Sequence, residues 1–355
     1  MKYKNNILET ATYLQSLEPG LRLDLIVLDK SLETNQGNQT LAIKILSIFG
    51  GILSSTAFFG FLLIAGLHKS NVALLIFGIL AIALGVIIGK LFRQILWDTI
   101  SVSTFSIGFI MLAMALSEFH VDTQYISISC AVFSLICLCL TPNYIISFVS
   151  TLILNGSMLS FVLSTNQYDF IYIHVSLLAI ILMYTFLQEA RLLFISFKIR
   201  LPYHAIRMGL VLSFLIGLGL LRHDIFFTLS TSLIWSVSIV CMVAILYLSS
   251  KLLTTLQLSV VVTRLAIYGL ILLVLAPTVL FPGIAGSILL ILLCFWVNYK
   301  TGFVMGILAL LYFVGQFYYD LNYTLLTKSV LLFLSGIVFL LFFLFISKRT
   351  NHEKI

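Results

Sequence analysis

Residues 72–89 read VALLIFGILAIALGVIIG, a run without a single charged or strongly polar side chain. An α-helix rises about 1.5 Å per residue, so this run covers about 27 Å, close to the hydrocarbon thickness of a bilayer. It shows no alternation of apolar and polar residues, which a transmembrane β-strand requires. The stretch therefore predicts a membrane-spanning helix.

The composition of the whole chain agrees with this stretch. Hydrophobic residues make up 61% of the sequence, charged residues only 9%, and the mean hydropathy is +1.15. These values lie far outside the range of water-soluble domains. The net charge of +7 comes from basic residues scattered between apolar runs, so it predicts no nucleic-acid partner. The sequence predicts an all-α integral membrane protein, a polytopic helical bundle.

Twelve apolar runs are long enough to be helices, although several fall short of 20 residues. Pro142 and the Phe281-Pro282-Gly283 break are all that separate two neighbouring pairs, so ten helices are the alternative count. The predicted ranges are Ile45–Leu67, Val72–Gly89, Ile95–Leu116, Tyr125–Leu140, Tyr144–Ser164, Phe170–Leu187, Ile206–Leu221, Ile225–Tyr247, Leu265–Leu280, Ile284–Val297, Gly302–Phe317 and Val330–Ile346.

The basic residues favour twelve helices with both termini in the cytoplasm. With that count, 17 of the 20 Lys and Arg residues fall on the inner side, and only Lys69, Arg222 and Lys328 fall outside. Fusing one doubtful pair would invert every later loop. Fusing the pair at Pro142, for example, would place the basic cluster at 191–207 outside, which the positive-inside rule disfavours.

The sequence divides into three parts. Residues 1–40 carry frequent charges and amphipathic spacing, which predicts a cytoplasmic or interfacial segment of two short helices; a partly ordered tail is the alternative. Residues 41–347 form the transmembrane domain, and residues 348–355 form a cytoplasmic tail. The inner loop Gln188–Ala205 begins with a stretch, 188–194, that predicts a helix in the headgroup layer.

Small residues at helical spacing predict close contacts between helices, because they let two backbones approach in lipid. Glycine is common in membrane helices, so chance spacing is the competing explanation. The glycines concerned are Gly51, Gly85, Gly89, Gly217, Gly302 and Gly306.

Three of the polar residues inside predicted helices, where such residues are costly, are singled out as functional candidates. Asp98 stands one turn into its helix and is interpreted as an interfacial aspartate or an ion site. His174 is interpreted as a hydrogen-bonded polar residue, and Asn155 as an interhelical hydrogen-bond donor or a substrate contact.

The cysteines all lie in apolar runs, and zinc, nucleophile-elbow and phosphate-loop motifs are absent. No catalytic residue, metal site or cofactor is predicted.

Residues 315–329 read GQFYYDLNYTLLTKS and are followed by a final apolar run. This stretch resembles the C-terminal signature of an uncharacterised family of bacterial multi-pass membrane proteins, typically encoded beside a second multi-pass protein and a protein with a GDYxxLxY motif. The resemblance implies the bacterial cytoplasmic (inner) membrane, lipids and partner membrane proteins as surroundings, and no known activity.

The same stretch holds a candidate functional cluster of Tyr318, Tyr319, Asp320 and Lys328. In one interpretation Lys328 reaches the headgroups while the tyrosines form an interfacial belt. In the other, the Lys328 amine turns inward to Asp320 or a tyrosine hydroxyl and grips an anionic group.

Three functions fit these observations. The first is a non-enzymatic membrane subunit that assembles with partner membrane proteins. A transporter or lipid flippase is the second, because the break at Pro282 and Gly283 could expose backbone near a midplane site. The third is a membrane-embedded transferase, for which the short predicted outer loops leave little room.

Overall fold

The computed structural model describes residues 41–320 with gaps, together with residues 333 and 337. The gaps are residues 65, 67–69, 92–94, 166, 200–201, 222–232, 256–266, 270, 273–274, 276–277 and 280. Every regular element in the described part is helical. The predicted segment 1–40, the tail 348–355, half of the predicted helix 265–280 and most of the predicted helix 330–346 lie outside the described residues.

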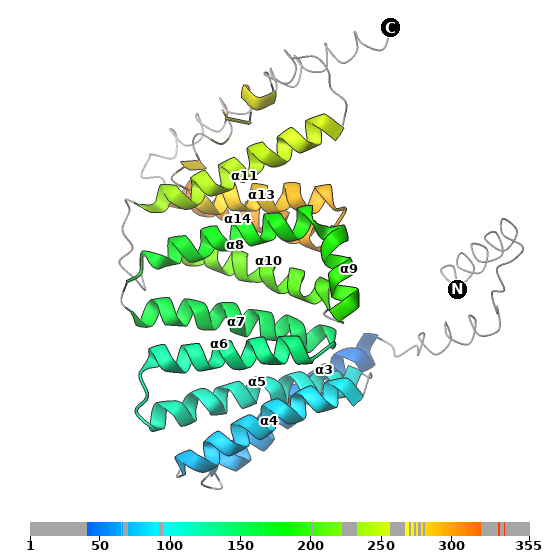
Figure 1. The fold of residues 1–355 in the computed structure, drawn as a ribbon, viewed down its shortest axis with the longest axis vertical. Coiled ribbons are helices and arrows are strands. Elements are labelled where there is room, and N and C mark those ends of the chain that lie inside the picture. Colours follow the sequence, from blue (N-terminus) through cyan, green and yellow to red (C-terminus); the bar gives the residue numbers. More distant parts are fainter. Residues whose placement is uncertain are drawn as a thin grey trace, which may run out of the picture.

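The helices lie side by side along the long axis of the molecule (Figure 1), in the order α4, α5, α6, α7, α10 and α8, followed by α14, α13 and α11. Helix α3 packs on α5, and α7 packs on α10. The bounds are α3 Leu41–Ile64, α4 Asn71–Leu91, α5 Ile95–Glu118, α6 Thr123–Leu140, α7 Tyr144–Ser164, α8 Phe170–Leu187, α9 Glu189–Ile199, α10 Tyr203–Leu220, α11 Ile234–Thr255, α13 Pro282–Trp296 and α14 Lys300–Asp320.

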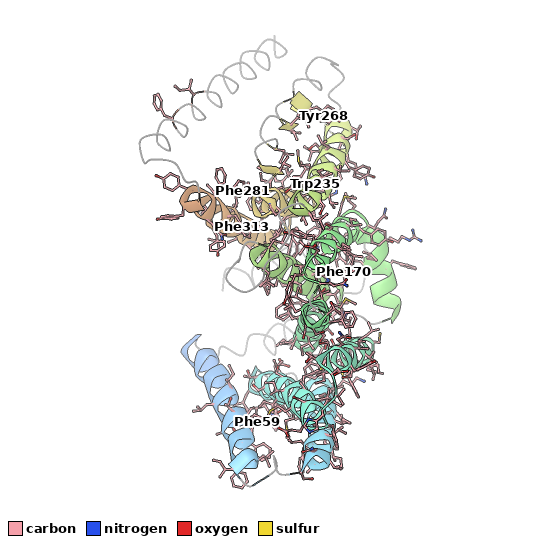
Figure 2. All side chains as sticks on the ribbon, turned by 90° about the vertical axis from the view of Figure 1, so that its left-hand side faces the viewer. Phe59, Phe170, Trp235, Tyr268, Phe281 and Phe313 are labelled. Carbon is pink, nitrogen blue, oxygen red and sulfur yellow. The ribbon has the colours of Figure 1, made fainter. Side chains whose placement is uncertain are left out.

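Eight described helices are long and apolar enough to cross a membrane, judged by length and composition: α4, α5, α6, α7, α8, α10, α11 and α14. Helix α13 is a shorter apolar helix. Side chains project from both flanks of the stacked helices (Figure 2), and many of the exposed ones are large and apolar. These features indicate a multi-pass membrane protein.

Helix α6 shows how such a helix distributes its residues. Its buried positions are small, namely Ser127, Cys130, Ser134 and Cys137. Most of its exposed positions are large and apolar, at residues 125, 128, 132, 135, 136 and 140. A water-soluble helix would bury the large residues, whereas in lipid the small ones allow close helix contact.

Two of the predicted helices match the structure at both ends, and others differ. Pro142 separates α6 from α7, and the Asn143 side chain caps α7 by accepting a hydrogen bond from the backbone N–H of Ile145 at 2.9 Å. For the predicted range Ile225–Tyr247, the start lies outside the described residues and the end is wrong, because α11 (Ile234–Thr255) continues to Thr255. The helix continues past Tyr247 because Leu248 and Leu253 are buried. The start of the segment between the predicted helices, from residue 248, is therefore helical and packs against the bundle.

The buried apolar residues form one large cluster and two smaller ones. The large cluster joins α8, α10, α11 and α13 and reaches Phe313 of α14. The smaller clusters lie among α4, α5, α6 and α7, and around Leu74 and Met111. Helix α7 contributes Val149 and Ile153 to one side and Leu159 and Val162 to the other, so it joins the two groups of helices.

Candidate functional site

A buried arginine lies at the end of the bundle where α8 ends and α10 begins. Arg207 stands in the second turn of α10, and its side chain is 4% exposed. Its Nη1 donates a hydrogen bond to Oε1 of Glu189 at 2.7 Å, and its Nη2 lies 3.2 Å from Nδ1 of His204. An ionised group buried in a membrane helix is costly and usually has a specific role.

Three aromatic rings surround the same guanidinium. Its central carbon lies 4.1 Å from the ring centre of Tyr299, 5.3 Å from that of Tyr203 and 5.4 Å from that of Phe186. Each distance suits a cation–π interaction, which strengthens when water is excluded. We call Arg207, Glu189 and these three rings the arginine cage. Within the described residues, the Nε atom of Arg207 has no hydrogen-bond partner.

The backbone explains how Tyr299 reaches the cage. Asn298 adopts a left-handed conformation with φ of 56°, and the Tyr299 N–H returns to the Cys294 carbonyl at 2.8 Å. This geometry closes the C-terminus of α13 and turns the chain toward α14, and asparagine tolerates it better than most residues. Burial raises the pKa of Tyr299, with Tyr144 adding to the shift while the Arg207 charge opposes it. The phenol therefore stays neutral near neutral pH.

The cage fastens α9 to the membrane helices. Glu189 is the first residue of α9, which runs crosswise to α8 and α10 at their ends (Figure 1). The hydroxyl of Tyr203 donates to the Thr185 carbonyl of α8 at 2.8 Å. Since these contacts come from α8, α9, α10 and the connection between α13 and α14, the cage locks four segments together.

Asp98 lies at the same end of the bundle, in the first turn of α5. The Nδ2 of Asn143 stands 3.3 Å from Asp98 Oδ1 and donates at 2.8 Å to the Gly89 carbonyl of α4. Asn143 therefore ties α4, α5 and α7 together.

The other predicted polar residues lie deeper in the bundle. Asn155 is buried, and its Nδ2 donates a hydrogen bond to the Thr151 carbonyl of its own helix at 2.8 Å. The sequence had predicted a hydrogen bond to another helix instead. Close by, Gly209 of α10 approaches α7, where a Cβ atom would meet Thr151 Cβ at 2.8 Å. His174 of α8 is half-buried. Asn155 and His174 are therefore not brought together with the arginine cage or Asp98.

The predicted packing glycines all lie at close contacts. A Cβ at Gly51 would meet Thr99 of α5, one at Gly217 would meet Val175 of α8, and one at Gly306 would meet Ile291 of α13. Gly302 faces Tyr299 and Cys294, Gly85 faces α5, and Gly89 faces both α7 and α5. The closest approach of α4 to α5 also uses Gly78 and Gly108, which the sequence reasoning missed.

The cluster near the end of α14 is only partly described. Tyr318 and Tyr319 contact each other edge to face with ring centres 5.9 Å apart, and Tyr319 is 82% exposed. Asp320 ends the helix, and Lys328 lies outside the described residues, so the proposed pairing of Lys328 stays a prediction.

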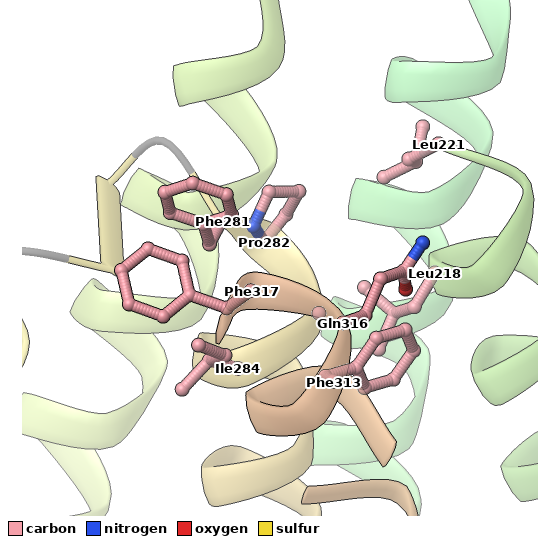
Figure 3. Close-up of a pocket in the computed structure, with 9 residues that line it drawn as sticks. Leu218, Leu221, Phe281, Pro282, Ile284, Phe313, Gln316 and Phe317 are labelled. Atoms are coloured by element: carbon pink, nitrogen blue, oxygen red, sulfur yellow. The ribbon is translucent and has the colours of Figure 1, made fainter. Parts of the chain in front are cut away.

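The break at Pro282 and Gly283 borders a cavity of about 20 Å³ (Figure 3). Leu218, Leu221, Phe313 and Phe317 surround it, and Gln316 is its polar side chain. A volume this small holds about one water molecule. A Cβ on Gly283 would lie 2.5 Å from Cδ1 of Phe313, so the glycine lets α14 pack against the break.

Arg207 is the functional candidate that the sequence reasoning missed. It lies at the second position of the predicted helix Ile206–Leu221 but was counted only among the basic residues of the inner side. The available signal was an arginine inside a predicted membrane helix, where a charged side chain is costly. Across the residues that the structure describes, no three His, Cys, Asp or Glu side chains gather as a metal site.

Comparison with known proteins adds one finding. Residues 40–349 match a family model described as Domain of unknown function (DUF4401). No curated protein and no solved structure matches the chain.

Proposed function

Since the chain belongs to the DUF4401 family, whose function is unknown, we propose a role from its own geometry: a non-enzymatic multi-pass membrane subunit that assembles with partner membrane proteins. The resemblance of residues 315–329 supports the bacterial cytoplasmic membrane as its location. The proposal is carried by a single feature of α3, the helix at the edge of the described bundle.

Helix α3 has two faces with small residues, and only one of them is used within the described chain. Gly51 and Ser55 are buried, with Gly51 against α5. Gly50, Ser54 and Ala57 follow one another at i, i+4 and i+7 and are exposed, and a Cβ on Gly50 would meet no atom within 4 Å.

The neighbouring helix α4 shows what a lipid-facing surface in this protein carries. Its exposed positions are mostly large and apolar, including Ile76, Leu80 and Leu84, with Ala83 as the small exception in mid-helix. Lipid tails gain nothing from small residues, whereas a second helix can approach them closely and gain van der Waals contact. The exposed small face of α3 therefore fits a helix of a partner protein.

Affinity purification from native membranes tests this proposal. Ser54→Phe places a large ring on the small face, and Ile79→Phe places the same ring on an exposed position of α4 as a control. We expect the yield of co-purifying membrane proteins to fall about tenfold with Ser54→Phe, equivalent to about 1.4 kcal/mol, and to stay constant with the control. An unchanged protein set with Ser54→Phe would reject the proposal.

We further propose twelve membrane helices with both termini in the cytoplasm. Eight described helices that can span a membrane and the placement of 17 of the 20 basic residues on one side support this topology. A reporter fused after Ile355 should be cytoplasmic, and one inserted at Asp169 should be external. A C-terminal reporter that is active only outside the cytoplasm contradicts the count.

One observation favours the second function, a transporter or lipid flippase. The hydroxyls of Ser150 in α7 and Ser213 in α10 are buried without a hydrogen-bond partner in the described structure. They belong to the two helices that join the halves of the bundle, where a polar path would have to run. The affinity purification also distinguishes the two functions, because a co-purifying lipid without a partner protein would favour the transporter or flippase.

A further inference from the structure

A second polar site lies at the boundary of the apolar helices, separate from the exposed face of α3 and from the arginine cage. An open cavity of about 450 Å³ stands between the C-terminus of α4 and the N-termini of α5 and α7. It is lined by Gly89, Lys90, Asp98, Pro142, Asn143, Tyr144 and Ile145. Because these helices end or begin here, the cavity lies at the level of lipid headgroups.

The lining combines one negative and one positive side chain. Asp98 is in the first turn of α5, where the helix dipole favours an acid. Lys90 is in the last turn of α4, where the helix dipole favours a base. The structure shows no ion pair between these two described residues, so both charges can face a ligand. Their arrangement matches a molecule that carries one charge of each sign.

Asn143 holds the acid in position. Its Nδ2 lies 3.3 Å from Asp98 Oδ1 and 2.8 Å from the Gly89 carbonyl, while its Oδ1 accepts from the Ile145 N–H. A Cβ on Gly89 would lie 2.4 Å from Ile146 Cδ1, 2.8 Å from Ser101 Oγ and 3.2 Å from that same Nδ2, so the glycine lets α4 come close to α5 and α7 where the bridge forms. The carboxylate is therefore oriented before any ligand enters.

We propose that this cavity binds a phosphoethanolamine group, supplied by a zwitterionic phospholipid of the membrane. Lys90 faces the phosphate, and the primary ammonium donates hydrogen bonds to Asp98. Pro142, Tyr144 and Ile145 form the less polar wall toward the glycerol and acyl chains. A phosphocholine group carries the same charges but has no N–H to donate, so the site distinguishes the two headgroups.

The test measures binding of defined phospholipids to the purified full chain in detergent by native mass spectrometry. We expect phosphatidylethanolamine to bind about threefold more tightly than phosphatidylcholine of the same acyl chains, the size expected for one exposed ionic contact. Asp98→Asn keeps the oxygen that faces Asn143 and should abolish this preference. Lys90→Met should weaken both lipids about equally.

Asp122→Asn serves as the control, because Asp122 lines a different cavity at the opposite end of the bundle with Thr123, Gln124 and Ser160. It should leave the preference intact. Soluble phosphoethanolamine is added as a competitor of bound phosphatidylethanolamine to identify the source of the group. If only a second phospholipid displaces the bound lipid, the ligand comes from the bilayer. If the soluble compound displaces it equally well, the ligand is free phosphoethanolamine and the lipid source is wrong. Equal binding of the two lipids to the wild type, or a preference that survives Asp98→Asn, would overturn the proposal.

Discussion

The helices α4 to α7 and the helices α8 to α14 are held together by different means. In the first group the contacts depend on glycine and hydroxyl residues: Gly85 touches Ser101 and Phe105, and the Ser134 hydroxyl donates to the Ser150 carbonyl. The second group also has close glycine contacts, at Gly217 and Gly306, but there one large apolar cluster fills the interior and a caged arginine closes one end.

The difference shows two solutions to the same physical problem. Lipid solvates apolar side chains well, so helices associate either by bringing backbones very close or by satisfying a polar group that lipid cannot solvate. The first group relies on close approach over several helix contacts. The second group combines close contacts with a polar attachment that is concentrated in one cage, so a single substitution in the cage should cost more.

The largest effect is expected for Arg207→Met. It leaves Glu189 without its partner and removes the cation from three rings, and we expect a loss of about 3 kcal/mol because Glu189 is only partly exposed. Thermal unfolding in detergent measures it, with Arg191→Met as the control, since Arg191 lies exposed on α9. Equal melting temperatures for the two variants would show that the cage does not hold the second group together.

A smaller effect is expected for Gly85→Leu in the first group. A Cβ there would lie 2.8 Å from Phe105 Cβ and 2.9 Å from the Ser101 carbonyl oxygen. We expect a loss of about 2 kcal/mol from this overpacking. Gly156→Leu is the matched control, because a Cβ on that mid-helix glycine of α7 meets no atom within 4 Å. If Gly85→Leu is as stable as Gly156→Leu, close approach does not stabilise this group.

Helix ends could be predicted where the chain marks them. Helix α7 follows Pro142 and the capping residue Asn143, and α8 follows Asp169, so both ranges agree with the structure. The end of α11 carries no proline or glycine, and its continuation to Thr255 depends on tertiary burial of Leu248 and Leu253. Such burial leaves no local mark in the sequence.

The sites show the same limit. Asp98 could be singled out because an acid in an apolar run is costly. Its neighbour Asn143 is 45 residues away in sequence, and only the fold brings them together. The rings of Phe186 and Tyr299 look like ordinary aromatic residues of apolar stretches, so nothing near them in sequence predicts a cage around Arg207.

The proposed role as a subunit is tested most directly by photocrosslinking along α3 in native membranes. A photoreactive residue would be placed in turn at Gly50, Ser54 and Ala57 on the small face, and at Ile76 and Leu80 of α4 as lipid-facing controls. Protein adducts at the three α3 positions, with only lipid adducts at the two α4 positions, are the predicted result. Lipid adducts alone at all five positions would contradict a partner helix on α3.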